Sequence, residues 1–156
     1  MQCMKIKLFL VGIVSLFAFH QLAAEQLQDE IVAAVIIKEA GGEGNLGMQA
    51  VANVIHNRAK KSRQSHFAVV TRKHQFECIA PVVVRKKMTY SQFVSNAKAH
   101  PKFSYAFELV KKMKAGSLPD VTKGSTHFHN PSMTPYWAKV LPLRVTIGRH
   151  LFYQES

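Results

Sequence analysis

Glu39 stands beside a glycine-rich turn and is a candidate for a catalytic acid. Residues 38–44 read K-E-A-G-G-E-G and follow the apolar run 33–37. A carboxyl that emerges from an apolar surface is favoured in its protonated form, because desolvation penalises its charge. A protonated acid beside a glycine-walled opening can protonate the leaving oxygen of a sugar. An ordinary surface role for this glutamate remains open on the motif alone.

Acidic side chains are scarce, and this limits the chemistry further. The 156 residues include 21 Lys+Arg and 9 Asp+Glu, a net charge of +12. A hydrolase with two carboxylates would have to pair Glu39 with Glu43, Glu77 or Asp120. A lytic transglycosylase needs one glutamate, which protonates the glycosidic oxygen and then accepts the proton of the sugar's own 6-hydroxyl. The composition therefore favours chemistry with one carboxylate.

A second polar and aromatic segment, G-S-T-H-F-H-N-P, spans residues 124–131 and is followed by Trp137. His-x-His could be a zinc pair, but no third ligand stands at a metal-binding spacing, so we expect no metal and no cofactor. The segment suits a saccharide cleft, in which the Trp137 ring covers a sugar face while Thr126, His127 and Asn130 bond hydroxyl and acetamide groups. For at least one ring of this segment a role in the core is the alternative.

Several other polar residues are expected to be structural. Asn53 and Asn57 share a helix face and suit contacts within the fold. Arg58 is expected to pair with Glu43 or with a carbonyl at a helix end. Cys78 is interpreted as a small core residue rather than a catalytic thiol.

The N-terminus has the pattern of a secretory signal peptide. Two lysines precede an apolar run over residues 8–19, and small residues lead to Ala24, where we place cleavage. An uncleaved membrane anchor is the alternative. Export would carry residues 25–156 to the periplasm or outside the cell, away from cytosolic nucleic acid, and would remove Cys3, leaving no internal disulfide.

Residues 25–156 are predicted to form a single, mainly helical α+β domain, since no repeat or linker divides them. Helical spacing predicts helices from Asp29 to Gly41, after Asn45 as N-cap, and over 91–99 and 103–113. The segment 67–84 is predicted to be irregular. Residues 145–147 and 151–153 are predicted to pair as a small hairpin.

The motifs in this order resemble the SleB-like cell wall hydrolases. The matching stretches are I-I-K-E-A-G-G-E-G, G-M-Q-A-V-A-N-V-I-H-N-R, V-V-x-x-x-x-Q-F-E-C, and G-S-T-H-F-H-N-P with P-Y-W-A. The resemblance implies a compact lysozyme-like fold and, as substrate, the glycan strands of peptidoglycan, cut between N-acetylmuramic acid and N-acetylglucosamine. It implies Glu39 as the catalytic acid. It also implies that five further residues belong to the substrate cleft: Glu43, Gln75, Phe76, Thr126 and His127.

The sequence departs from the family pattern at Gly41, where arginine is frequent, and at Glu77, where a small residue is usual. Both departures concern substrate preference. The basic surface is expected to hold a monomeric protein on an anionic wall or membrane. Two other classes of function stay open: a non-catalytic basic module that binds wall polymers, and a metal hydrolase that uses His127 and His129.

Overall fold

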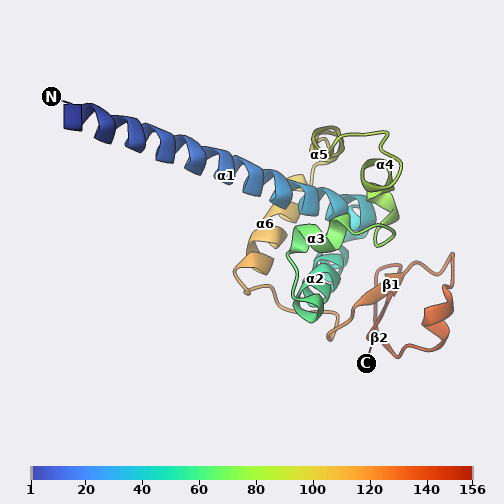
Figure 1. The fold of residues 1–156 in the computed structure, drawn as a ribbon. Coiled ribbons are helices and arrows are strands. Elements are labelled where there is room, and N and C mark those ends of the chain that lie inside the picture. The colour runs from blue at the N-terminus through green and yellow to red at the C-terminus, as the bar shows by residue number, and fades with distance from the viewer. Residues whose placement is uncertain (1, 156) are drawn as a thin grey trace.

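The computed structural model describes residues 2–155, with side chains from Phe19 onward. Most of the predicted signal peptide, and Cys3 with it, lies outside the described side chains, so its cleavage stays a prediction. Within the described part, no helix combines the length and the apolar run that a membrane crossing requires. The chain forms helices packed around the end of one long helix, with a small sheet on one side (Figure 1).

Helix α1 (Gln2–Ala40) is the central element of the domain. Residues 31–37 and Ala40 are buried, and Ala33 and Ala34 are fully inaccessible. Helices α2 (Gly44–Ser62), α5 (Tyr90–Lys98) and α6 (Phe103–Lys114) all contact α1, so this part of the helix is apolar on every side. The predicted helix end before Gly41 is confirmed, and so are the predicted helices over 91–99 and 103–113.

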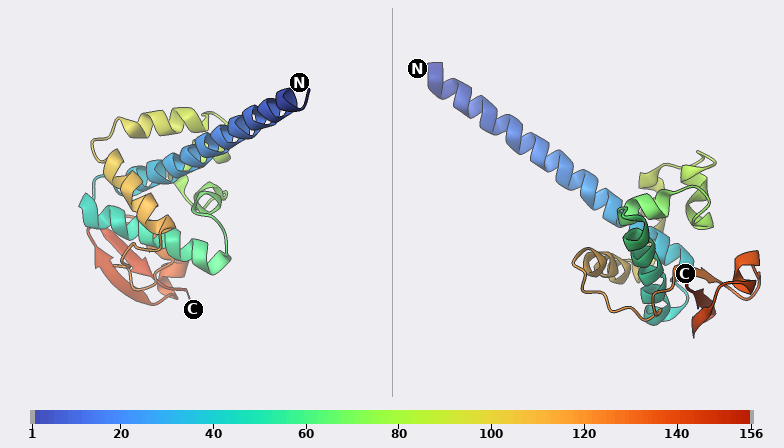
Figure 2. Two further views of the ribbon diagram at one scale, coloured as in Figure 1. Left: turned by 90° about the vertical axis from the view of Figure 1, so that its left-hand side faces the viewer. Right: turned by 60° about the horizontal axis from the view of Figure 1, so that its bottom comes forward.

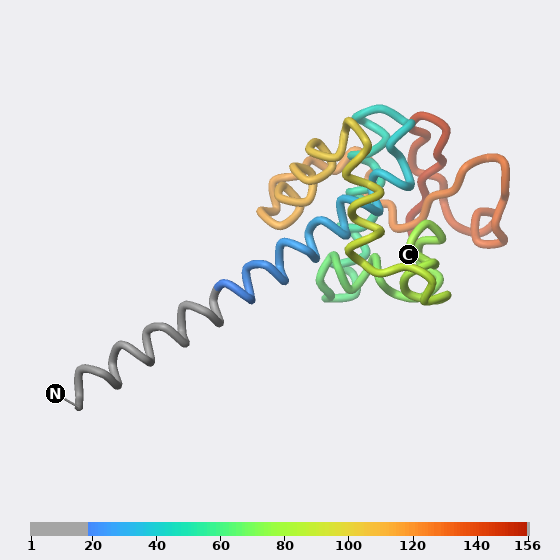
Figure 3. Tube along the Cα trace, turned by 90° about the horizontal axis from the view of Figure 1, so that it is seen from above, coloured from blue at the N-terminus to red at the C-terminus, as the bar shows by residue number. Residues whose placement is uncertain are grey.

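Around residues 19–26, α1 leads away from the domain, as Figures 2 and 3 show. Residues 19–26 are exposed. Ion pairs then attach the helix to its neighbours: Lys114 contacts Glu25 at 2.6 Å and Asp29 at 2.8 Å, and Lys98 contacts Glu30 at 2.8 Å. Glu25, the first residue of α1 to form one of these ion pairs, directly follows Ala24.

The prediction that Asn45 caps α2 is wrong, because the helix begins two residues earlier than predicted, at Gly44. Glu43 is the N-cap, and its side chain makes no capping hydrogen bond. Its carboxylate is instead bound to Arg149, in another part of the fold. A tertiary contact therefore takes the place of the local cap that the sequence favours.

The prediction of irregular structure over 67–84 is also wrong. The segment forms α3 (His66–Thr71), the short 3-10 helix η1 (Glu77–Ile79) and α4 (Ala80–Val83). Ser65 caps α3 by accepting a hydrogen bond from the Ala68 backbone at 3.1 Å. The β-branched Val69 and Val70 are buried against the core, so packing overrides their preference for strands.

Three strands form an antiparallel sheet in the order β1-β3-β2. The predicted hairpin is confirmed as β2 (Leu143–Ile147) and β3 (His150–Tyr153), while β1 (His127–His129) was not predicted. A short 3-10 helix, η2 (Tyr136–Lys139), lies in the loop between β1 and β2. Phe152 and Ile147 pack against buried residues of α2, which fixes the sheet on the helical part. The fold is thus mainly helical α+β, as predicted.

Candidate active site

Glu39 lies in the last turn of α1, half-buried, where it lines a cleft of about 420 Å³. The opposite wall comes from β1, β3 and the loop after β1. We call this space the catalytic cleft. It is lined by Glu39, Arg58, Gln75, Phe76, Glu77, Phe128, His129, Asn130, Ser132, Met133, Pro135, Trp137 and His150.

Aromatic rings line the same cleft as this carboxyl. Phe76 is 3% exposed, and its ring centroid lies 6.5 Å from that of Phe128. Phe128 packs in turn edge-on against the His150 ring, at 5.2 Å between centroids. Trp137 lies half-buried on the loop side of the cleft. Rings that line a cleft beside a carboxyl suit the binding of a sugar.

Cys78 contacts Glu39 through a hydrogen bond but does not line the cleft. Burial raises the pKa of the Cys78 thiol, and the charge of Glu39 and a hydrogen bond with it act in the same direction. The thiol is therefore protonated and a poor nucleophile at neutral pH. This agrees with the interpretation of Cys78 as a packing residue.

Glu43, the second glutamate of the motif, does not line the cleft. Its side chain is 8% exposed, and it accepts hydrogen bonds from Arg149 Nε at 2.8 Å, Arg149 Nη2 at 2.6 Å and the Arg149 backbone N–H at 3.0 Å. These hydrogen bonds lower the pKa of the Glu43 carboxyl. Glu43 thus ties the turn after α1 to the β2–β3 turn.

The glycines around these glutamates serve packing as well as access. A Cβ on Gly41 would lie 2.7 Å from the Ile37 carbonyl oxygen and 3.1 Å from His100 Nε2. Gly41 is buried, whereas Gly42 is exposed and has open space around it. An arginine at position 41, which the family pattern favours, has no room in this fold.

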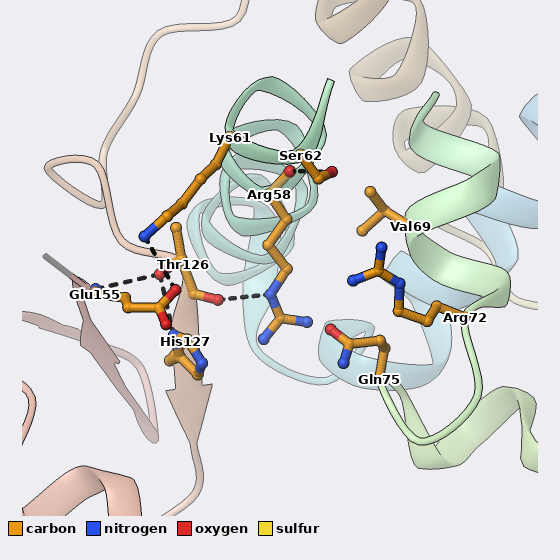
Figure 4. Close-up of a pocket in the computed structure, with 9 residues that line it drawn as sticks. All are labelled: Arg58, Lys61, Ser62, Val69, Arg72, Gln75, Thr126, His127 and Glu155. Atoms are coloured by element: carbon orange, nitrogen blue, oxygen red, sulfur yellow. Dashed lines mark hydrogen bonds and ion pairs between the residues drawn. The ribbon is translucent and has the colours of Figure 1, made fainter. Parts of the chain in front are cut away.

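Thr126 and His127 lie beside a second cavity, of about 380 Å³, which we call the basic pocket (Figure 4). Thr126 is 5% exposed, and its carbonyl accepts a hydrogen bond from Arg58 Nε at 2.6 Å. Burial lowers the pKa of His127, and the nearby charge of Arg58 lowers it further. Arg58 and Gln75 line both cavities, so the two spaces adjoin.

At the end of β1 and in the loop after it, His129 and Asn130 form hydrogen bonds within the fold. Asn130 Oδ1 accepts a hydrogen bond from the Ser132 backbone at 3.1 Å. The two ring nitrogens of His129 lie within hydrogen-bond distance of the Asn130 carbonyl and the Tyr153 hydroxyl. Trp137 packs on His127 and His129, with centroids 5.0 and 5.6 Å away. No three His, Cys, Asp or Glu side chains are grouped as metal ligands among the residues described here.

Of the three possible partner carboxylates for Glu39, Glu77 alone lines the same cleft among the described residues. It is exposed and forms an ion pair with Arg85. Asp120 accepts hydrogen bonds from the Thr122 and Gly124 backbone and from Asn57. These bonds outweigh burial and lower the pKa of Asp120. Asp120 is therefore a structural residue of its loop.

The asparagines of α2 are structural, as expected. Asn53 donates to the Pro119 carbonyl at 3.1 Å and accepts from the Val121 backbone at 3.1 Å. Asn57 donates to the Ser125 carbonyl at 3.0 Å. They hold the loop before β1 against α2.

Sequence reasoning did not find Arg58, Phe128 and His150 as cleft residues. For Arg58 a signal was present: it stands three, four and seven positions after Ile55, Val54 and Val51, all of which are buried. A charged residue in register with a buried face is a candidate for function. The placements of Phe128 and His150 depend on the pairing of β1 with β3, which the sequence did not reveal.

A half-buried carboxyl in a cleft lined by rings, carried by a small helical domain, is the arrangement of a glycan-cleaving enzyme. Residues 42–153 match the family Cell Wall Hydrolase. The chain therefore belongs to the cell wall hydrolase family. The match begins three residues after Glu39.

Two solved structures share the fold. The catalytic domain of the Bacillus cereus SleB protein is 23% identical, with a TM-score of 0.57 over 83% of this chain and 91% of that one. The catalytic domain of the germination-specific lytic transglycosylase SleB from Bacillus anthracis is 24% identical, with a TM-score of 0.63 over 83% and 95%. The search of curated proteins found no match. The expected SleB-like, lysozyme-like fold is confirmed.

Proposed function

We propose that this protein is an exported lytic transglycosylase that cuts peptidoglycan glycan strands between N-acetylmuramic acid and N-acetylglucosamine. The observation that carries the proposal is the position of Glu39, a half-buried carboxyl in a cleft with Phe76, Phe128 and Trp137. Membership of the cell wall hydrolase family supports the substrate class. The name of the Bacillus anthracis structure, a lytic transglycosylase, supports the reaction type.

In the proposed reaction Glu39 acts twice. Its carboxyl first gives a proton to the glycosidic oxygen as the bond to C1 of the muramoyl sugar breaks, and the departing sugar leaves as an alcohol. The resulting carboxylate then accepts the proton of the 6-hydroxyl of the same muramoyl sugar while O6 bonds to C1. The product is a 1,6-anhydro sugar. Glu39 is protonated again, and no water is consumed.

The other cleft residues bind the glycan in this proposal. The rings of Phe76 and Trp137 contact sugar faces, and Gln75 and Asn130 face the polar groups. Thr126 and His127 act from the basic pocket. Glu43 contributes by position, since its contact with Arg149 joins the end of α1 to the sheet that forms the opposite wall.

Hydrolysis with a second carboxylate is the alternative, and the presence of Glu77 in the catalytic cleft is the observation that favours it. In that reaction Glu77 would activate a water molecule. Glu77 is exposed and forms an ion pair with Arg85, so water can reach its carboxylate. The two reactions leave different ends on the products.

In this proposal, residues 1–24 act as a signal peptide that directs export. Residues 25–156 form a single domain, which needs no cofactor. Residues 19–24 are exposed, and the ion pairs of α1 with α6 begin at Glu25, which supports cleavage after Ala24. Loss of the two lysines of the leader reduces the net charge from +12 to +10, which would hold a monomer on an anionic wall or membrane surface without nucleic acid as partner.

The test is digestion of purified sacculi by the wild type and by Glu39→Gln, with mass analysis of the released muropeptides. We expect anhydro-muropeptides from the wild type and no soluble product from Glu39→Gln, with an unchanged circular dichroism spectrum. Reducing ends, together with an equal loss in Glu77→Gln, would establish hydrolysis instead. Salt-sensitive binding without any product would show a wall-binding module.

A further inference from the structure

The basic pocket adjoins the catalytic cleft and differs from it in character. It lies between α2, the end of α3 and β1, and Figure 4 shows Arg58 in its middle, with Arg72 and Gln75 on one side and His127 on the other. Arg58 and Gln75 line both spaces. A side group of a polymer bound in the cleft can therefore reach into the pocket directly.

Arg58 has donor capacity that the fold does not use. Its Nε donates to the Thr126 carbonyl, but Nη1 is buried and has no hydrogen-bond partner within the described part of the chain. The guanidinium lies 5.2 Å from the centroid of the Phe76 ring. A buried donor without a partner costs free energy, so a ligand acceptor at this position would be favoured.

The charge of the pocket is positive. Arg58, Lys61 and Arg72 carry three positive charges, and Glu155 supplies the single carboxylate among the lining residues. That carboxylate is already paired with Lys61 at 3.1 Å. Burial lowers the pKa of Arg58 to about 10, which still leaves it charged at neutral pH. Two guanidinium groups therefore face a cavity without a contacting carboxylate of their own in the described structure.

We propose that the basic pocket binds a carboxylate of the peptide that the muramoyl sugar carries. This inference rests on the proposed function, because it requires a glycan strand in the cleft. The peptide branches from the muramoyl sugar itself, so a strand held at Glu39 brings its acidic groups to the adjoining pocket in a fixed register. The planar fork of a guanidinium matches a carboxylate in two-point hydrogen bonding.

Arg72 is the residue that tests the proposal. It is exposed at the end of α3 and lines the basic pocket but not the cleft, and its Nη2 bonds Gln64 at 2.9 Å. Arg72→Gln removes the charge without opening the core. Arg144→Gln, at an exposed position of β2 outside both cavities, is the matched control for charge.

The experiment compares kcat/KM on glycan strands with their peptides and on strands freed of peptide by an amidase. We expect the wild type to prefer peptide-bearing strands, and Arg72→Gln to reduce that preference about tenfold through KM, while Arg144→Gln keeps it. An equal loss on both substrates, or an unchanged preference, would overturn the proposal. If the wild type cuts neither substrate, the proposed function itself fails.

A binding measurement separates the anion sources. The catalytically blocked Glu39→Gln protein is titrated with a muramoyl disaccharide that carries its peptide, the same disaccharide without peptide, and a soluble wall phosphate polymer. We expect the peptide to tighten binding about tenfold, and Arg72→Gln in the same background to abolish the gain. Competition by the phosphate polymer, with no gain from the peptide, would assign the pocket to wall phosphate and contradict the proposal.

Discussion

Glu43 and Arg149, which are 106 positions apart, are joined by two guanidinium hydrogen bonds and one backbone hydrogen bond. Glu43 follows the turn after α1, and Arg149 lies in the turn between β2 and β3. One wall of the catalytic cleft comes from each of these parts. The contact therefore fixes the distance between Glu39 and the strands that face it.

Arg149→Ala is expected to lower Tm by a few degrees, because it removes the two guanidinium hydrogen bonds to the Glu43 carboxylate and leaves the backbone hydrogen bond alone. The folded-state pKa of Glu43 lies below its ordinary value, so its stabilising effect is present above that value and is lost as the pH falls through the folded-state pKa. The variant should therefore lose less stability in acid than the wild type. Thermal melts between pH 7 and 3 measure this, with Arg144→Ala as the control, which should follow the wild type.

Gly148→Ala is expected to destabilise the fold more than Gly116→Ala. Both glycines have positive φ, 58° and 66°, which costs alanine about 1 kcal/mol or more at either site. A Cβ at Gly148 would also lie 2.7 Å from Glu43 Oε2, whereas Gly116 has nothing within 4 Å. Urea unfolding should show a difference of at least about 1 kcal/mol between the variants. Equal losses would mean that the carboxylate moves aside freely.

The pair His56 and His66 is expected to make stability depend on pH. Their rings lie 3.0 Å apart between Nδ1 and Nε2, and burial lowers the pKa of both, with Lys60 adding to the effect on His56 and His56 to that on His66. The unfolded chain then binds more protons near its ordinary pKa of 6.5, so stability is complete above that pH and falls as the pH drops through it.

His66→Asn should reduce this loss of Tm between pH 7.5 and 5.5, because one of the two titrating rings is removed. The matched control is His74→Asn, at an exposed position with a positive φ that asparagine tolerates. A control that flattened the profile as much as His66→Asn would contradict the assignment to the pair.

Cys78 should resist thiol reagents in the folded protein, because burial and Glu39 raise its pKa and leave little thiolate. In a Cys3→Ser background, labelling by a disulfide reagent at pH 8 is expected to be more than about tenfold slower in buffer than in 6 M guanidinium, a denaturing condition. Labelling at the unfolded rate would show that the thiol is accessible and ionised.

The parts of this fold that the sequence predicts are those that depend on local pattern. The helical spacing before Gly41 and the strand content around Gly148 both led to the correct elements. The errors arise from contacts between distant segments. Burial of Val69 and Val70 places β-branched residues in a helix, the bond from Arg149 replaces the expected cap of α2, and β1 exists because β3 pairs with it.

The same distinction between local pattern and distant contacts applies to the candidate site. Glu39 could be chosen from its apolar approach and its glycines, and Gln75, Phe76, Asn130 and Trp137 lie with it in the cleft. That Thr126 and His127 belong to an adjoining cavity depends on how β1 lies beside α2. Single-residue chemistry gives no information on that arrangement. Nor does it show that Arg58 connects the two cavities.

The residues that line the cleft span positions 39 to 150, so the two walls of the cleft are synthesised at different times. Helix α1 precedes β3, which carries His150 and its partner Phe152, so it is made before them. Until they arrive, β1 has no strand to pair with, and the wall opposite Glu39 is missing. A cleft built this way is incomplete in the nascent chain until β3 has been made and has paired with β1.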